Sequence, residues 1–61
     1  MKEKVLSYAV QVFGNQDTAQ QWLNRENPML GNKKPIDLLN TDQGCGLVLD
    51  ILGRIEEGVY S

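Results

Sequence analysis

The single cysteine, Cys45, and the complete absence of histidine limit this chain more than any other feature of its sequence. One cysteine cannot form an internal disulfide, and without histidine a zinc site of the Cys/His type cannot be built. A chain of 61 residues buries only about 60% of the surface that its unfolded form exposes. Packing, capping and association must therefore hold the fold. A lone thiol is typical of a reducing compartment, so we expect a cytoplasmic protein.

The charge pattern argues against nucleic acid and membranes as partners of this chain. The formal net charge is −2, and six basic residues are scattered among eight acidic ones. Proteins that bind nucleic acid typically have a clustered basic surface instead. No apolar run approaches the roughly 18 residues of a membrane span, and residues 2–13 are too short and too interrupted for a signal peptide. We therefore predict a soluble protein.

Apolar residues at helical spacing predict two helices in the first part of the chain. The first has apolar residues at i, i+3, i+4 and i+7, the stripe of an amphipathic helix. These residues are Leu6, Ala9, Val10 and Phe13. Gly14 can end this helix in the left-handed conformation, and Asn15 can cap a second helix that ends near Asn24. Trp22 lies on the apolar face of the second helix, so we interpret it as a core anchor, with an interface role as the alternative.

Two prolines begin short helical segments in the middle of the chain. Proline is well tolerated at the first position of a helix, where its missing N–H costs nothing. Residues 27–31 predict a single turn, which we expect to tuck Met29 and Leu30 inward. Residues 35–39 predict a second short helix, ended by Asn40.

The last helix is the longest. Thr41 is the best capping residue of the chain, and the helix behind it is expected to run to about Glu57, with Gly58 as its stop. No segment has the strict period of two that predicts a strand. The sequence therefore predicts one all-α domain over residues 1–61. We expect a small bundle of four to five short helices with a long C-terminal helix and a short tail.

The last helix carries more apolar surface than one core contact requires. Its main stripe consists of Cys45, Val48, Leu49, Leu52 and Ile55. Leu47 and Ile51 widen this arc to about 200°, where about 100° suffices against one core. The first helix likewise has a second apolar face, with Val5, Tyr8 and Val12. Either neighbours wrap a central helix, or one flank of each helix binds another chain. We favour the second interpretation, because so few residues exist to do the wrapping.

No pattern in the sequence predicts a catalytic, cofactor or metal site, and we expect that the protein is not an enzyme. Residues 44–46 suggest a phosphate loop, but no strand precedes them and Asp42 would repel the anion. Cys45 has no histidine to act as its base, so we interpret it as a small buried residue. Each glycine of this segment weakens the helix by about 1 kcal/mol relative to alanine. Close approach of another element would compensate for that loss.

Taken in order, these segments resemble the toxin-binding domain of the Xre/MbcA/ParS antitoxin family. The resemblance covers nearly the whole chain from Val5 onward, and it rests on the order and spacing of short motifs. The matching residues are Phe13-Gly14, Ala19, Trp22-Leu23-Asn24, Asn27-Pro28-Met29-Leu30-Gly31, Pro35-Ile36-Asp37-Leu38-Leu39, Thr41-Asp42-Gln43-Gly44, Val48, Leu52-Gly53-Arg54-Ile55 and Glu57-Gly58-Val59-Tyr60-Ser61.

The resemblance implies a bacterial antitoxin module of a type II toxin–antitoxin system. The usual partner of such domains is a RES-domain toxin, which consumes NAD or uses it for ADP-ribosylation. In the family the end of the domain approaches the active site of the toxin. Here that implies a contact through Arg54, Glu57, Gly58, Val59, Tyr60 and Ser61. Leu47 and Ile51, on the apolar flank of the last helix, complete the predicted partner-binding surface. We expect steric inhibition, because a tail of about 16 Å from Glu57 to Ser61 is long enough to enter a cleft.

The chain departs from the family pattern in three ways. The DNA-binding helix-turn-helix domain that usually precedes this module is not among these 61 residues, so we expect no operon repression by this chain alone. Lys34 stands before Pro35 where threonine is common, and Gly46 stands where a longer polar residue is usual.

The sequence also allows two alternatives to toxin binding. The chain could be the homodimerisation module of a transcriptional regulator, pairing through Leu47 and Ile51 or through Val5 and Tyr8. It could also be a minimal NAD- or phosphate-processing enzyme at residues 44–46.

Overall fold

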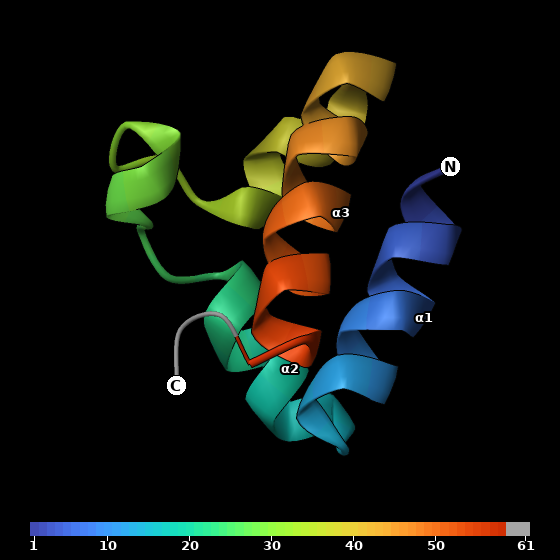
Figure 1. Cartoon of the computed structure of the whole chain (residues 1–61). Helices are drawn as coiled ribbons and strands as arrows, with labels where there is room; N and C mark the ends of the chain where they lie inside the picture. Colours follow the sequence, from blue (N-terminus) through green and yellow to red (C-terminus); the bar gives the residue numbers. More distant parts are fainter. Residues whose placement is uncertain (59–61) are drawn as a thin grey trace.

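The computed structural model describes residues 1–58, which form three α-helices and two short 3₁₀ helices (Figure 1). In chain order these are α1 (Lys2–Phe13), α2 (Gln16–Leu23), η1 (Pro28–Leu30), η2 (Pro35–Asn40) and α3 (Asp42–Glu56). Within this range no strand forms, and the only β-type pairing is an isolated antiparallel bridge between Asn27 and Lys33. The all-α prediction, with its long last helix, is confirmed.

The helix α3 lies at the centre of the molecule. Figure 1 shows α1 beside it and running in the same direction, while α2 lies below and η2 behind. The helix α3 packs mainly against α1 and η2, and α1 also packs against α2. The parallel arrangement of α1 and α3 arises because the chain returns through α2, η1 and η2 before α3 begins. As a result, residues of α1 lie beside residues of α3 that are far away in the sequence.

The helix boundaries are set by the capping residues that the sequence predicts. Gly14 has φ 83° and ends α1, and its N–H donates to the carbonyl of Val10. Asn15 begins α2, where its Oδ1 accepts the N–H of Thr18 at 2.8 Å. Thr41 begins α3, where its Oγ1 accepts the N–H of Gly44 at 3.0 Å. Each cap satisfies a backbone group that the helix itself leaves unpaired.

The face that α1 turns to the core is not the predicted one. Val5 and Ala9 are fully buried, whereas Leu6 and Phe13 are half-buried and Val10 is exposed. The prediction of a stripe centred on the four residues from Leu6 to Phe13 is therefore wrong. The reason is that α1 contacts both α2 and α3. Its most buried residues therefore lie between its two apolar stripes.

The proline-initiated turn η1 also differs from its prediction. Met29 keeps 49% of its surface exposed and Leu30 is half-buried, so the turn does not tuck Met29 inward. Local hydrogen bonds close the turn, because the carbonyl of Asn27 accepts the N–H groups of Leu30 and Asn32, each at 2.9 Å. The turn thus satisfies its own backbone, and it projects from the bundle (Figure 1).

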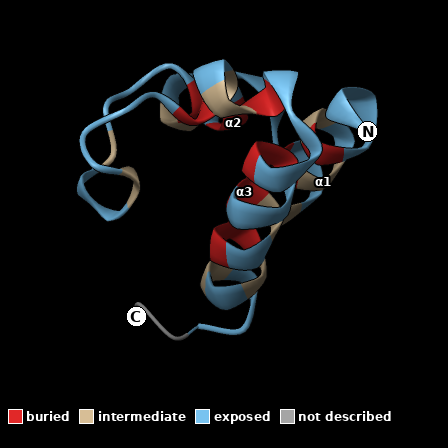
Figure 2. Cartoon of the chain, turned by 90° about the horizontal axis from the view of Figure 1, so that it is seen from above, coloured by how far each residue is buried: buried red, intermediate tan, exposed pale blue. Residues whose placement is uncertain are grey.

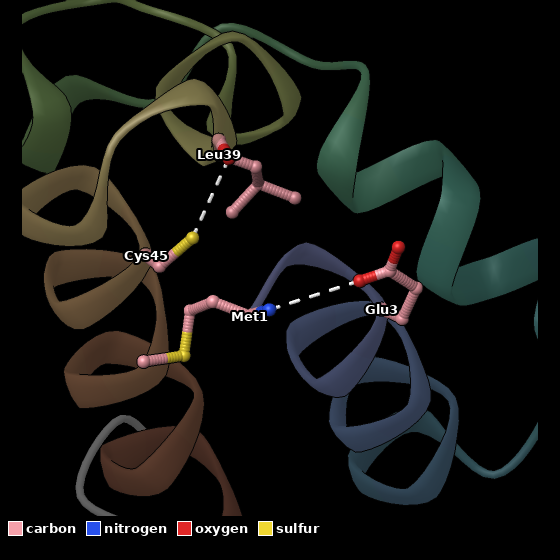
Figure 3. A network of polar contacts seen from close by, with 4 residues as sticks. All are labelled: Met1, Glu3, Leu39 and Cys45. Atoms are coloured by element: carbon pink, nitrogen blue, oxygen red, sulfur yellow. Dashed lines mark hydrogen bonds and ion pairs between the residues drawn. The ribbon is translucent and has the colours of Figure 1, made fainter.

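The start of α3 is packed tightly against η2. Cys45 is buried, and its Sγ lies 3.5 Å from the carbonyl oxygen of Leu39. Figure 3 shows the two groups pointing toward one another. The interpretation of Cys45 as a small buried residue is confirmed. A Cβ at Gly44 would collide with the carbonyl group of Leu38, so the expected close approach is present there. At Gly46 it is absent, because a Cβ would meet nothing within 4 Å.

Candidate partner-binding surface

Most of the wide apolar arc of α3 is covered by the chain itself. Figure 2 shows buried residues along one side of this helix and exposed residues along the other. Val48 and Leu52 are fully buried, and Leu49 is half-buried. Of the two flank residues, Ile51 is only 5% exposed, whereas Leu47 is 55% exposed. The prediction of an open flank on α3 is therefore right at Leu47 and wrong at Ile51.

The prediction of an open apolar flank on α1 is also wrong. Val5 has no exposed surface, and Tyr8 and Val12 are half-buried against the core. They belong to the core or pack against it, so they do not form an open second flank. The interpretation of a central helix wrapped by its neighbours accounts for most of the apolar surface, because both η2 and α1 pack against α3.

Polar and charged residues surround Leu47 on the exposed side of α3. Asp50 and Arg54 lie one and two turns further along, and their side chains form an ion pair at 3.1 Å. Both side chains are at least half-exposed, so this pair contributes little to stability. An apolar residue with a polar rim is the usual composition of a protein–protein contact.

The end of α3 leads to the predicted contact residues. The N–H of Glu57 donates to the carbonyl of Gly53, and the N–H of Gly58 donates to that of Ile55, both at 3.0 Å. Gly58 has φ 79°, a left-handed conformation that glycine adopts without strain. The prediction of Gly58 as the helix stop is confirmed. The remaining predicted contact residues, Val59, Tyr60 and Ser61, lie outside the described residues.

A side-chain hydrogen bond joins α1 to the end of α3. The phenol of Tyr8 donates to Oε1 of Glu56 at 2.8 Å, across 48 positions of the sequence. This bond raises the pKa of Tyr8, because the phenol must keep its proton in order to donate it, and the negative charges of Glu56 and Glu57 add to the effect. Sequence reasoning missed this pair, since helical spacing says nothing about contacts between separate helices.

Beside this bond, a shallow groove follows the seam between α1 and α3. Its volume is about 400 Å³. The residues that line it are Lys4, Ser7, Tyr8, Gln11 and Leu49. Leu49 belongs to α3 and the other four residues to α1, so the groove lies between the two parallel helices.

Trp22 lies at the junction of α1 and α2. Its ring is 5.7 Å from that of Phe13, centroid to centroid, at an angle of 43°. Both rings are half-buried and pack against the core, which agrees with the interpretation of Trp22 as an anchor. A tilted pair of this kind adds about 1 kcal/mol beyond the burial of its area.

Residues 44–46 offer little to a phosphate group. The N–H of Gly44 donates to the Thr41 side chain and that of Cys45 donates to the Thr41 carbonyl. Over residues 1–58, no three His, Cys, Asp or Glu side chains come together in a way that could hold a metal ion. None of the helices described here combines the length and the apolar character needed to cross a membrane.

Comparison of the sequence with known proteins identifies one family. The profile of the antitoxin Xre/MbcA/ParS C-terminal toxin-binding domain matches residues 9–58. Two proteins named Antitoxin Xre are similar to 95% of the chain, one from Photorhabdus laumondii at 39% identity and one from Yersinia enterocolitica at 37%. The chain spans about 40% of the length of each of these relatives. No solved structure matches it. The chain therefore belongs to the antitoxin Xre/MbcA/ParS C-terminal toxin-binding domain family.

Proposed function

We propose that this chain is the toxin-neutralising module of a type II toxin–antitoxin system and acts in the bacterial cytoplasm. Its partner is a RES-domain toxin that consumes NAD or uses it for ADP-ribosylation. Membership of a toxin-binding family supports the class of partner, and the names of the two relatives agree with it. The observation that carries the proposal is Leu47, an exposed apolar residue on the longest helix of a chain from that family.

The proposed contact begins at Leu47 and follows α3 towards its end. Arg54, Glu57 and Gly58 lie further along this helix and its stop, and they continue the contact. Buried Ile51 supports the surface from below and does not touch the partner. A standard interface buries about 800 Å² on each side, which is roughly a fifth of the 4147 Å² that this chain exposes.

Inhibition in this proposal is steric. The contact through α3 provides affinity, and residues 59–61 obstruct the substrate pocket of the toxin. Binding and inhibition should then respond to different changes, because one depends on the helix and the other on the tail.

One variant and a matched control test the contact through α3. Leu47→Glu places a charge within the contact, so we expect at least a ten-fold loss of affinity for the toxin that copurifies with the chain from its native host. Met29→Glu is the control, because Met29 is similarly exposed at 49% but lies on η1. Isothermal titration calorimetry measures the affinity, and circular dichroism confirms that both variants fold. Equal losses from both variants would contradict a contact centred on α3.

The tail is tested by removing residues 59–61. We expect this truncated chain to bind the toxin and to lose most of its protection of NAD, because the pocket is then open. The measurement is NAD turnover by the toxin at saturating antitoxin. Full protection by a well-folded truncation would reject the steric role of the tail.

A further inference from the structure

Gly46 is a glycine inside α3 whose presence the packing of residues 1–58 does not explain. It lies away from both ends of the helix and is exposed to solvent. A Cβ at this position would meet no heavy atom of the described residues within 4 Å, so the fold leaves room for a side chain. Glycine inside a helix destabilises it relative to alanine. At Gly44 the close approach of Leu38 compensates for this loss, but at Gly46 nothing within the described chain does.

Gly46 shares the exposed side of α3 with three other residues at helical spacing. Counted from the first, the four stand at i, i+3, i+4 and i+7, and all are exposed. They are Gln43, Gly46, Leu47 and Asp50, and we call them the Gly46 surface. Four residues with this spacing are neighbours on a helix, and a side chain of a facing element can pack among them. Because Gly46 has no side chain, the space among the other three is wider than usual.

The chemistry of the Gly46 surface differs from one side to the other. Leu47 is 55% exposed, more than any other large apolar residue in the described helices. Asp50 carries a carboxylate, which pairs with Arg54 at 3.1 Å and has sites for further hydrogen bonds. An apolar side next to an acceptor fits a large side chain that has an apolar body and a donor at its end. Tyrosine, tryptophan and arginine have this character, and they are the residues enriched at interface hot spots.

We propose that Gly46 is a specificity-determining residue of the toxin contact. Its missing side chain admits one large side chain of the toxin, whose apolar body packs against Leu47 and whose end donates a hydrogen bond to Asp50. This inference rests on the proposed function. The Gly46 surface is continuous with the contact proposed there, and it lies within residues 9–58, the range that matches the toxin-binding family.

The proposal makes stability and affinity oppose each other at one position. In the free chain Gly46 only weakens the helix, because no neighbour makes use of the space above it. In the complex the toxin provides the close approach that Leu38 provides at Gly44. A side chain at position 46 should therefore stabilise the free protein and weaken the complex.

The test measures both quantities on the same variants. Calorimetry gives the melting temperature of each free chain and its affinity for the toxin that copurifies with the chain from its native host. Gly46→Ala should raise the melting temperature and weaken binding about ten-fold, because its methyl group takes part of the space. Gly46→Gln is also a good helix former, and it should weaken binding about a hundred-fold because it fills the space. A glycine with a structural role alone would show a higher melting temperature and unchanged affinity.

Gly53→Ala is the matched control, because it makes the same change in the same helix. A Cβ at Gly53 would lie 3.7 Å from the phenol oxygen of Tyr8, an ordinary contact, so this glycine faces α1. We expect Gly53→Ala to raise the melting temperature and to leave the affinity within two-fold of the wild-type value. The gain in helix propensity is common to both alanine variants, so a difference in affinity between them arises from the position.

The chemistry of the toxin side chain is tested at Asp50. Asp50→Leu removes the acceptor and keeps a similar volume, so we expect binding about ten-fold weaker, the scale of a hydrogen bond to a charged group. Equal or tighter binding by this variant would contradict a donor at the end of the toxin side chain. Circular dichroism confirms that each variant is folded.

The outcomes separate this inference from the function on which it rests. Unchanged affinity in both Gly46 variants, or equal losses in Gly46→Ala and Gly53→Ala, overturns the role of Gly46. If Leu47→Glu weakens binding and the Gly46 variants do not, this inference fails and the contact through α3 stands. If none of these changes affects binding, the contact through α3 and this inference fail together. A chain that binds no toxin would reject the proposed function itself.

Discussion

Gly44 and Gly46 lie two positions apart in α3, yet their surroundings differ completely. At Gly44 the backbone of η2 comes so close that a side chain would collide with the carbonyl group of Leu38. At Gly46 the space is open. Both glycines weaken the helix in the same way, because they increase the entropy of the unfolded chain. Only at Gly44 does a tertiary contact compensate for this loss.

Alanine substitutions at the two positions should therefore have opposite effects. We expect Gly44→Ala to lower the free energy of unfolding by about 2 kcal/mol, because backbone atoms cannot easily move away from the new methyl group. We expect Gly46→Ala to raise it by up to about 1 kcal/mol, since the helix gains propensity at no steric cost. Urea unfolding followed by circular dichroism measures both. A stabilised Gly44→Ala variant would contradict the close approach of η2 to α3.

At the scale of elements, α1 shows how the packing of helices decides the roles of residues. Its sequence carries two apolar stripes, and periodicity alone cannot say which one faces inward. Packing against α2 and α3 together buries Val5 and Ala9 and leaves Val10 exposed. The same packing brings Tyr8 to Glu56, which links the two parallel helices by a hydrogen bond.

This link makes the stability of the α1–α3 pair depend on pH in the alkaline range. The pKa of Tyr8 is raised by its hydrogen bond to Glu56 above its ordinary value of 10.0. A raised pKa means that the folded state binds the phenol proton more tightly than the unfolded state does. The stabilisation is thus fully present below pH 10, and it is lost as the pH rises through the higher pKa of the folded protein.

The test compares the melting temperatures of the wild-type chain and of Tyr8→Phe over a range of pH. The melting temperature of the wild-type chain should exceed that of Tyr8→Phe at pH 8, and the gap should shrink as the pH rises above 10. Deprotonation of lysine affects both proteins equally, so it cancels in the difference. Differential scanning calorimetry at several pH values measures the gap. A gap that stays constant to pH 11 would show that the hydrogen bond does not contribute to stability.

At the scale of the whole molecule, the chain covers its own core more completely than its size suggests. The central helix is wrapped by α1 and η2, and within residues 1–58 the exposed large apolar residues are few and scattered. They are Met1, Val10, Met29 and Leu47. Scattered exposed apolar residues are normal on soluble proteins and do not by themselves indicate self-association.

We therefore predict that the chain without its toxin is a monomer. Two of the residues through which a dimer was predicted to pair, Val5 and Ile51, are buried within the chain. A stable dimer needs roughly 800 Å² from each copy, which Leu47 alone cannot supply. Sedimentation equilibrium at low micromolar concentration measures the mass. A dimer at that concentration would support the homodimerisation module and contradict this prediction, whereas binding to the toxin would remain possible on another face.

Local sequence signals were sufficient to predict the helices and the residues at which they begin and end. Asn15, Thr41 and Gly58 act within one or two turns of the chain, so their roles as caps and stops follow from residue type and position. The helical periods predicted the all-α fold for the same reason. The motifs also predicted the antitoxin family, since their order and spacing run along the chain and do not depend on how the helices pack.

Tertiary structure decided which apolar faces are hidden and which residues meet across the fold. Ile51 and Leu47 are nearly equivalent in the periodic pattern, yet one is buried and the other exposed. Tyr8 and Glu56 are 48 positions apart, so no local rule could pair them. Periodicity describes each helix on its own, whereas burial depends on where the neighbouring helices lie. For this reason the sequence by itself determined the elements and the family, and the packing around α3 determined the surface available to a partner.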